Sequence, residues 1–88
     1  MANYNIRLRT SAASELEALP PDSREHAVVA LAALAGDPFP VAAERIGSGD
    51  HFRMRLEGCV IVYSLEAERL RATVARVRAS GADRNTAV

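Results

Sequence analysis

The sequence predicts an α+β fold in which two N-terminal helices pack on one face of a small, mainly antiparallel, four-stranded sheet. Two apolar-rich stretches, 51–57 and 59–63, are separated only by Gly58, which leaves no room for a crossover helix and predicts an antiparallel hairpin. Two segments with apolar residues at helical spacing precede this hairpin. Alternating segments on either side complete the predicted order of strand, helix, helix, strand, strand, strand.

The first predicted strand covers residues 3–9, where apolar and polar side chains alternate. A short helix follows, because Thr10 or Ser11 offers an N-cap and acidic residues occupy the early turns. The helix is predicted to stop at Pro20-Pro21, since the residue before a proline disfavours the helical conformation.

The second predicted helix runs from Asp22 to about Ala35, with Gly36 as its C-terminal cap. Asp22 and Glu25 have the spacing of a capping box. The residues that recur at helical spacing, and that we expect to pack on the sheet, are Val28, Leu31, Leu34 and Ala35. Residues 39–49 predict a loop, because prolines and glycines interrupt them and no period persists.

The hairpin forms the centre of the predicted sheet. Its first strand alternates apolar and polar residues, which is typical of a strand with one buried face. The polar side chains, which share the other face, are His51, Arg53, Arg55 and Glu57. The second strand is apolar at every position from Cys59 to Tyr63, which is typical of a central strand covered on both faces. We expect Cys59 to be a buried, inert thiol and Tyr63 to pack in the core.

The last predicted strand covers residues 70–78, after a polar turn at 66–68. Strict alternation places Arg76 and Arg78 on the same face as Val74. Residues 79–88 show no apolar pattern and predict an irregular tail.

Charge is unevenly distributed along the chain. Eleven arginines balance eleven acidic residues, and there is no lysine. Residues 1–50 hold four arginines and seven acids, whereas residues 51–88 hold seven arginines and four acids. The second half is therefore the expected anion-binding half. The net charge of zero argues against a strong general nucleic-acid binder.

The composition predicts a single domain over residues 1–88 with a modest core. With one cysteine, no signal peptide and no long apolar run, we expect a cytoplasmic protein with no membrane partner. We also expect no metal site and no cofactor.

Several segments, taken together in their order and spacing, resemble the RelE/ParE superfamily of bacterial type II toxins over residues 3–78. The segments are Tyr4-Asn5-Ile6-Arg7-Leu8, Ser11-Ala12-Ala13-Ser14-Glu15-Leu16, Leu19-Pro20, Leu31-Ala32-Ala33-Leu34 with Asp37-Pro38, Phe52-Arg53-Met54-Arg55-Leu56 and Val60-Ile61-Val62-Tyr63. The resemblance implies a RelE-like fold. It also implies a toxin that a cognate antitoxin protein holds silent in a toxin–antitoxin hetero-oligomer.

The resemblance implies two activities. RelE-like members cleave mRNA in the ribosomal A site, so the leading interpretation is a metal-independent endoribonuclease, an mRNA interferase, whose partners are the ribosome and mRNA. ParE-like members inhibit DNA gyrase, which is the first alternative. A catalytically inactive relic that binds only its antitoxin is the second. The fold alone does not decide among them.

Cleavage by attack of a 2′-hydroxyl needs a base, an acid and cations around the phosphate. Arg53 and Arg55 fall at basic positions of the family, whereas its third-strand arginine is replaced by Val60. The predicted catalytic residues are His51, as general acid or base, with Arg53 and Arg55. The predicted nucleic-acid-binding residues are Arg53, Arg55, Arg76, Arg78 and Arg84. The alternative role for the strand arginines is a salt bridge, for example to Glu44 or Glu66.

Overall fold

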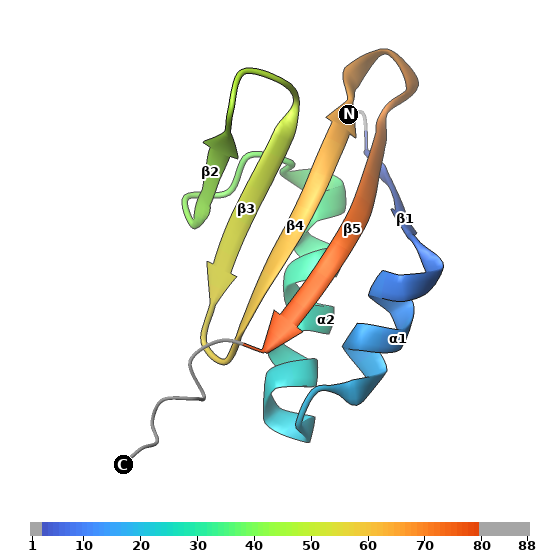
Figure 1. The fold of residues 1–88 in the computed structure, drawn as a ribbon. Helices are drawn as coiled ribbons and strands as arrows, with labels where there is room; N and C mark the ends of the chain where they lie inside the picture. Colours follow the sequence, from blue (N-terminus) through green and yellow to red (C-terminus); the bar gives the residue numbers. More distant parts are fainter. Residues whose placement is uncertain (1–2, 80–88) are drawn as a thin grey trace.

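The computed structural model describes residues 3–79 and shows two helices on one side of a five-stranded sheet (Figure 1). The elements in chain order are β1 (Asn5–Leu8), α1 (Thr10–Ala18), α2 (Pro21–Gly36), β2 (Ala43–Ile46), β3 (His51–Leu56), β4 (Cys59–Glu66), a 3₁₀ helix (Ala67–Arg69) and β5 (Arg71–Ala79). The strand order is β1-β5-β4-β3-β2. Among the described strands only β1 and β5 pair in parallel, and the predicted α+β class is confirmed.

The sheet has one strand more than the sequence predicts. Strand β2 lies inside the predicted loop and pairs antiparallel with β3, from Ala43 opposite Met54 to Ile46 opposite His51. Its four residues, Ala-Glu-Arg-Ile, show no alternation, so their pattern does not indicate a strand. The strand forms because β3 offers it a row of unpaired backbone groups at the sheet edge.

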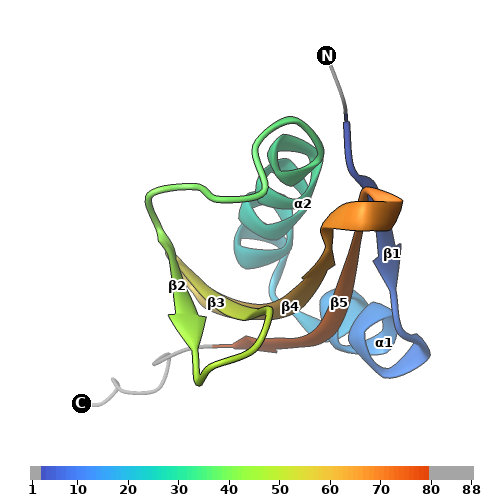
Figure 2. The same cartoon turned by 90° about the horizontal axis from the view of Figure 1, so that it is seen from above.

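One hydrophobic core lies between the helices and the sheet, and Figure 2 shows the sheet curving around α2. The buried residues are Ala12, Leu19, Ala27, Leu31, Leu34, Phe52, Met54, Cys59, Ile61, Tyr63, Leu65, Ala72, Val74 and Val77. The expected packing of Leu31 and Leu34 is confirmed, but Val28 is 50% exposed. The buried stripe of α2 passes instead through Ala27, whose small side chain lets the helix approach closely. Neither described helix is long and apolar enough to cross a membrane.

Tyr63 lies at the centre of this core, as predicted. Its ring stacks on Phe52 with the centroids 5.5 Å apart, and its hydroxyl donates to the Pro38 carbonyl oxygen at 3.0 Å. Burial, with a contribution from the Asp37 charge, raises the pKa of Tyr63 to about 12. Burial also raises the pKa of the Cys59 thiol, in agreement with the expected inert cysteine.

The predicted hairpin is confirmed. Strands β3 and β4 pair from His51 opposite Ser64 to Leu56 opposite Cys59, and two residues form the turn. Gly58 is required there for two reasons, because its φ is +91° and because a Cβ would collide with the Ser23 hydroxyl at the start of α2. The turn thereby locks the hairpin against the first turn of the helix.

A β-bulge in β5 corrects the predicted assignment of its two faces. Tyr63 lies opposite Val74, but Val62 lies opposite Arg76, so Ala75 is an extra residue in β5. The alternation therefore changes phase at Ala75. As a result Val77, rather than Arg76, joins Val74 on the buried face. The strand also runs through Ala79, where the sequence predicts the tail to begin.

Candidate functional site

No helix within residues 3–79 covers the sheet face opposite α1 and α2, as Figures 1 and 2 show. Strand register places four arginines there in two neighbouring rows across β3, β4 and β5. The inner row consists of Arg53, Val62 and Arg76, and the turn row, next to the β3–β4 turn, consists of Arg55, Val60 and Arg78. The bulge is what brings the two β5 arginines to this face.

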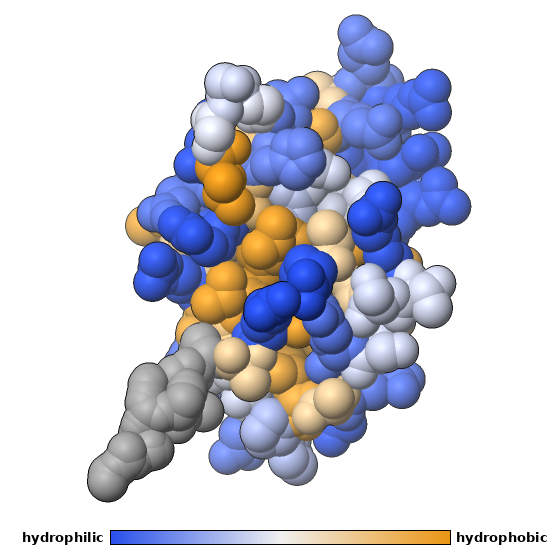
Figure 3. Space-filling model, in the orientation of Figure 1, coloured by the Kyte–Doolittle hydropathy of each residue, from blue (hydrophilic) through white to orange (hydrophobic). Residues whose placement is uncertain are grey.

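The rows are close enough for their side chains to act on one ligand. Strands lie about 4.8 Å apart, so the two arginine Cα atoms of a row are separated by about 10 Å. The rows follow each other at about 7 Å along the strands. Val60 and Val62 are half-buried between the arginines. Figure 3 shows hydrophobic residues in the middle of this face, with strongly hydrophilic residues over and around them.

Arg53 of the inner row forms an ion pair with Glu44 of β2 through its Nη2 atom. The hydrogen bond from Arg53 lowers the pKa of Glu44. The Arg53 Nε atom is covered and has no hydrogen-bond partner among residues 3–79. The salt-bridge alternative that the sequence leaves open is therefore present for Arg53 and Glu44. Glu66 pairs with Arg71 instead, at 3.5 Å.

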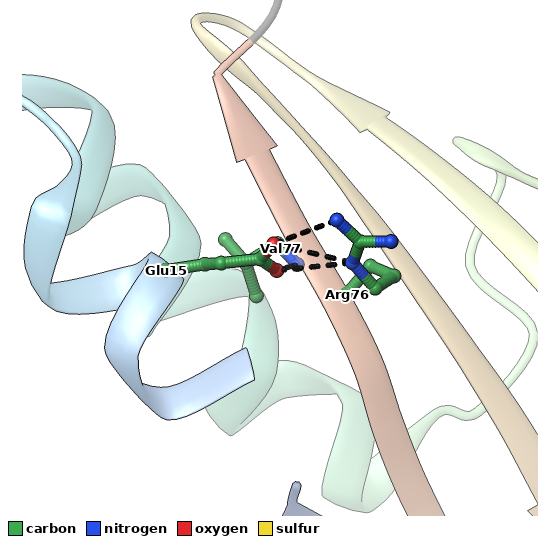
Figure 4. A network of polar contacts seen from close by, with 3 residues as sticks. All are labelled: Glu15, Arg76 and Val77. Atoms are coloured by element: carbon green, nitrogen blue, oxygen red, sulfur yellow. Dashed lines mark hydrogen bonds and ion pairs between the residues drawn. The ribbon is translucent and has the colours of Figure 1, made fainter. Parts of the chain in front are cut away.

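Arg76 of the inner row is bound by Glu15 of α1 (Figure 4). Its Nη2 and Nε atoms donate to Glu15 Oε2 at 2.9 and 3.1 Å. The Val77 amide donates to Glu15 Oε1 at 2.7 Å. The hydrogen bonds from Arg76, and then from Val77, lower the pKa of Glu15. Sequence reasoning missed this contact, and no local pattern could have revealed it across 61 residues.

The position of Glu15 follows from the path of β1. That strand pairs with β5 as far as Leu8 opposite Val74, and the Arg9 amide then donates to the Val74 carbonyl oxygen at 3.0 Å. The chain turns into α1 at this point, so the Val77 amide of β5, which points toward the β1 side, has no strand partner. The carboxylate of Glu15 accepts that hydrogen bond from Val77 in place of a strand.

The turn row differs from the inner row because neither of its arginines has a carboxylate partner within the described residues. Arg55 and Arg78 are both exposed. Their charges still act over distance, since Arg55 contributes to the lowered pKa of Glu44 and Arg78 to that of Glu15. The uncompensated positive charge of this face is therefore concentrated in the turn row.

His51 lies on the same face, on the other side of the inner row. It is exposed and shares its row with Ser64 of β4 and Thr73 of β5. A pocket of about 460 Å³ borders it, lined also by Arg9 and Glu66. His51 is two residues from Arg53 and four from Arg55, so the respective Cα separations are about 7 and 13 Å.

The structure thus brings together five of the six predicted site residues on one face, from β3 and β5. The sixth, Arg84, lies outside the described residues. Guanidinium groups on this face can bind phosphate or carboxylate oxygens, and the imidazole of His51 lies on the same face.

No family model matches the sequence, and no curated protein matches it either. Solved structures do match. The RelBE2 toxin–antitoxin complex of Mycobacterium tuberculosis is 25% identical over 90% of this chain and 93% of that chain, with a TM-score of 0.75. The RelE–RelB complex of Pyrococcus horikoshii matches over 90% and 97% of the two chains, with 19% identity and a TM-score of 0.80. The isolated RelE toxin of E. coli matches over 86% and 83%, with 23% identity and a TM-score of 0.76.

Proposed function

We propose that this chain, which has the fold of the RelE toxins, is itself the toxin of a type II toxin–antitoxin pair and cleaves ribosome-bound mRNA. The observation that carries the proposal is the open sheet face, where four arginines surround two valines on the side away from the helices. Arginine presents a planar, permanently charged fork that matches phosphate oxygens. Such a face suits the backbone of an RNA strand.

The chemistry that we propose is a transesterification within the RNA strand. The 2′-hydroxyl gives up its proton, its oxygen attacks the adjacent phosphorus, and the bond to the 5′-oxygen breaks. The 5′-oxygen takes up a proton, which leaves a 2′,3′-cyclic phosphate and a 5′-hydroxyl end. Arginines stabilise the added charge on the phosphoryl oxygens but do not exchange protons, because they stay charged. Tyr63 is unsuitable for proton transfer, since its hydroxyl is held in the core. His51 is therefore the proposed general acid or base for one of the two proton transfers, and solvent water serves the other. His51 lies two residues from Arg53 on β3.

An antitoxin protein is the proposed partner of this chain. The similar structures include RelE proteins in complex with RelB antitoxins. An acidic segment of such a partner would compete with RNA for the arginine face, because carboxylates and phosphates use the same donors.

A second candidate is a relic that binds an antitoxin but does not cleave RNA. Two observations favour it: the inner-row arginines are already bound by Glu15 and Glu44, and Val60 stands where the family resemblance places an arginine. Inhibition of DNA gyrase is a further outcome that the same experiment detects.

The test is expression of the full chain in bacteria, alone and together with the product of the adjacent reading frame. We expect growth arrest with cut mRNA when the chain is alone, and normal growth with the partner. Growth arrest with intact mRNA and a DNA-damage response would favour gyrase, and undisturbed growth would favour the relic.

The site is tested by replacing Arg53 and Arg55 together with alanine, and by His51→Ala. We expect both variants to remain folded and to lose mRNA cleavage. The matched control is His26→Ala on α2, which removes an exposed histidine from outside this face. Full cleavage by a folded Arg53/Arg55 double variant would remove these residues from the site.

A further inference from the structure

Helix α2 is apolar on the side that faces solvent as well as on the side that faces the sheet. From Ala27 to Gly36 it has no polar side chain. Within this stretch Val29 is 63% exposed, and Ala33 is exposed one turn further along the helix. A surface helix normally carries polar residues on its outer face, whereas a helix that is apolar all round is normally covered. The outer face of α2 therefore has the composition of an interface.

A groove of about 530 Å³ lies between this helix face and the end of strand β3. Its apolar lining consists of Val29, Ala30 and Ala33 from α2 and of Leu56 from β3. Leu56 also packs against the hydrophobic core, so it belongs to the covered face of the sheet. The groove therefore opens on the helix side of the molecule, away from the arginines of the open face.

Two contacts hold the walls of the groove together. The His26 Nδ1 atom donates to the Glu57 carbonyl oxygen at 3.2 Å, and it must carry the hydrogen because a carbonyl oxygen only accepts. Gly58 packs so closely on Ser23 that a Cβ would collide with its hydroxyl. The β3–β4 turn is thus fixed beside the first turns of α2 (Figure 1). A groove that is already formed requires little ordering when a ligand binds.

The rim of the groove is acidic. Glu25 of α2 and Glu57 of the β3–β4 turn line it, and both side chains are exposed. Neither forms an ion pair within residues 3–79, and the lining residues include no arginine. An apolar groove bordered by unpaired carboxylates complements an aliphatic chain that ends in a cation. Lysine has this structure, with a four-carbon stem and an ammonium group at its end.

We propose that this groove binds an amphipathic helix of a partner protein, in which lysines flank an aliphatic stripe. Val29 and Ala33 are four residues apart on α2, and a second helix presents its side chains at the same repeat. The small side chain of Ala33 allows that helix to approach closely. Its aliphatic residues cover Val29 and Leu56, and its lysine stems lie along the apolar lining with the ammonium groups at the two glutamates. The inference goes beyond the proposed function and does not rest on it, because the groove lies across the sheet from the arginines.

A second copy of this chain does not match the chemistry of the groove. The chain contains no lysine. Its own α2 carries Glu25 near one end, and Asp37 directly follows the other end. Two α2 helices packed against each other would therefore bring acidic side chains together in either orientation. Charge complementarity favours a basic partner over self-association.

The test is an NMR titration of the full chain with two synthetic helical peptides of 16 residues, the length of α2. Both peptides are alanine-based and carry leucines four residues apart. Lysines flank the leucines in one peptide, and glutamates flank them in the other. The signals of Val29, Ala33 and Leu56 report binding at the groove and separate it from binding at the arginines. We expect the lysine peptide to bind at the groove roughly tenfold more tightly than the glutamate peptide, because two ion pairs replace two contacts between like charges.

Variants of the chain test the charge and the apolar lining separately. Replacing Glu25 and Glu57 together with lysine should reverse the preference, so that the glutamate peptide binds at the groove more tightly. Val29→Ser should weaken binding of the lysine peptide by roughly fivefold or more, because less apolar surface is buried. The matched control is Val41→Ser, which changes a fully exposed valine outside the groove and should leave the affinity unchanged. Circular dichroism verifies that each variant is folded.

Several results would overturn the inference. They are no binding of the lysine peptide, equal affinity of the two peptides at the groove, an unchanged preference in the lysine double variant, and shifts that fall outside the groove residues. Analytical ultracentrifugation of the chain alone tests the remaining occupant. Dimerisation that Val29→Ser abolishes would show that a second copy covers the groove, and it would overturn the proposed partner as well.

Discussion

The two faces of the sheet are built from alternate residues of the same strands, yet they differ in burial and in charge. On the covered face Ile61 and Tyr63 are fully buried under the helices. On the open face Val60 and Val62, their immediate neighbours, are only half-buried between arginines. We therefore expect stability to depend mainly on the covered face, and the ligand binding that we propose to depend on the open face. Substitutions on the two faces should separate these properties.

The largest expected effect is on the covered face. Ile61→Ala should lower the free energy of unfolding by about 2–5 kcal/mol, because the residue is fully buried and its neighbours relax only partly into the cavity that it leaves. Val62→Ala, one residue along the same strand, should cost less than half as much. Urea denaturation of both variants measures the difference. Equal losses would mean that the open face is packed as tightly as the core.

A smaller effect is expected where the two faces meet, at the β3–β4 turn. Gly58→Ala should destabilise the fold by about 1–3 kcal/mol, since the residue has a positive φ and the new methyl group meets the Ser23 side chain. The control is Gly36→Ala, where no atom lies within 4 Å of an added Cβ. Thermal unfolding of the two variants separates the effect of the turn from that of losing a glycine.

Removing the Tyr63 hydroxyl tests how much its hydrogen bond adds to the stability that the ring packing provides. Tyr63→Phe keeps the stack on Phe52 and removes the hydrogen bond to Pro38. We expect a loss of about 1 kcal/mol in the free energy of unfolding. A gain in stability would show that the Pro38 carbonyl oxygen is hydrogen-bonded as well by water as by the Tyr63 hydroxyl.

The smallest expected effect is a change in how stability depends on acidic pH. It arises at Glu15, which contacts Arg76 of the open face and Val77 of the covered face. The pKa of Glu15 is lowered in the folded state by Arg76 and Val77. Its ionised form therefore contributes stability at neutral pH, and this contribution is lost as the pH falls below about 4.5 and through the lowered pKa. Glu15→Gln should flatten the decline in melting temperature between neutral and acidic pH. A decline as steep as that of the wild type would exclude Glu15 as its source.

Local sequence patterns predicted the strands in which the side chains themselves show the pattern of burial. Alternation located β3, and the continuous apolar run located β4, because each strand has its own repeating contact with the core. Strand β2 was missed since its pairing depends on β3 rather than on its own four residues. Such an edge strand has no pattern to detect.

The open face was predictable in part. Strict alternation correctly placed His51, Arg53 and Arg55 together, away from Phe52 and Met54. It failed in β5, where the bulge at Ala75 reverses the faces of Arg76 and Val77. The conflict between charged and apolar residues on one predicted face was a usable sign of that bulge. The glutamate partners depend on long-range contacts, which periodicity does not report.

Glu15 also affects whether the edge of β5 beyond the end of β1 can pair with another strand. An unpaired amide on an exposed strand invites the backbone of another molecule to extend the sheet. The carboxylate of Glu15 fills that vacancy from within the chain. We therefore expect the Glu15 side chain to oppose strand addition by a second molecule at this part of the β5 edge.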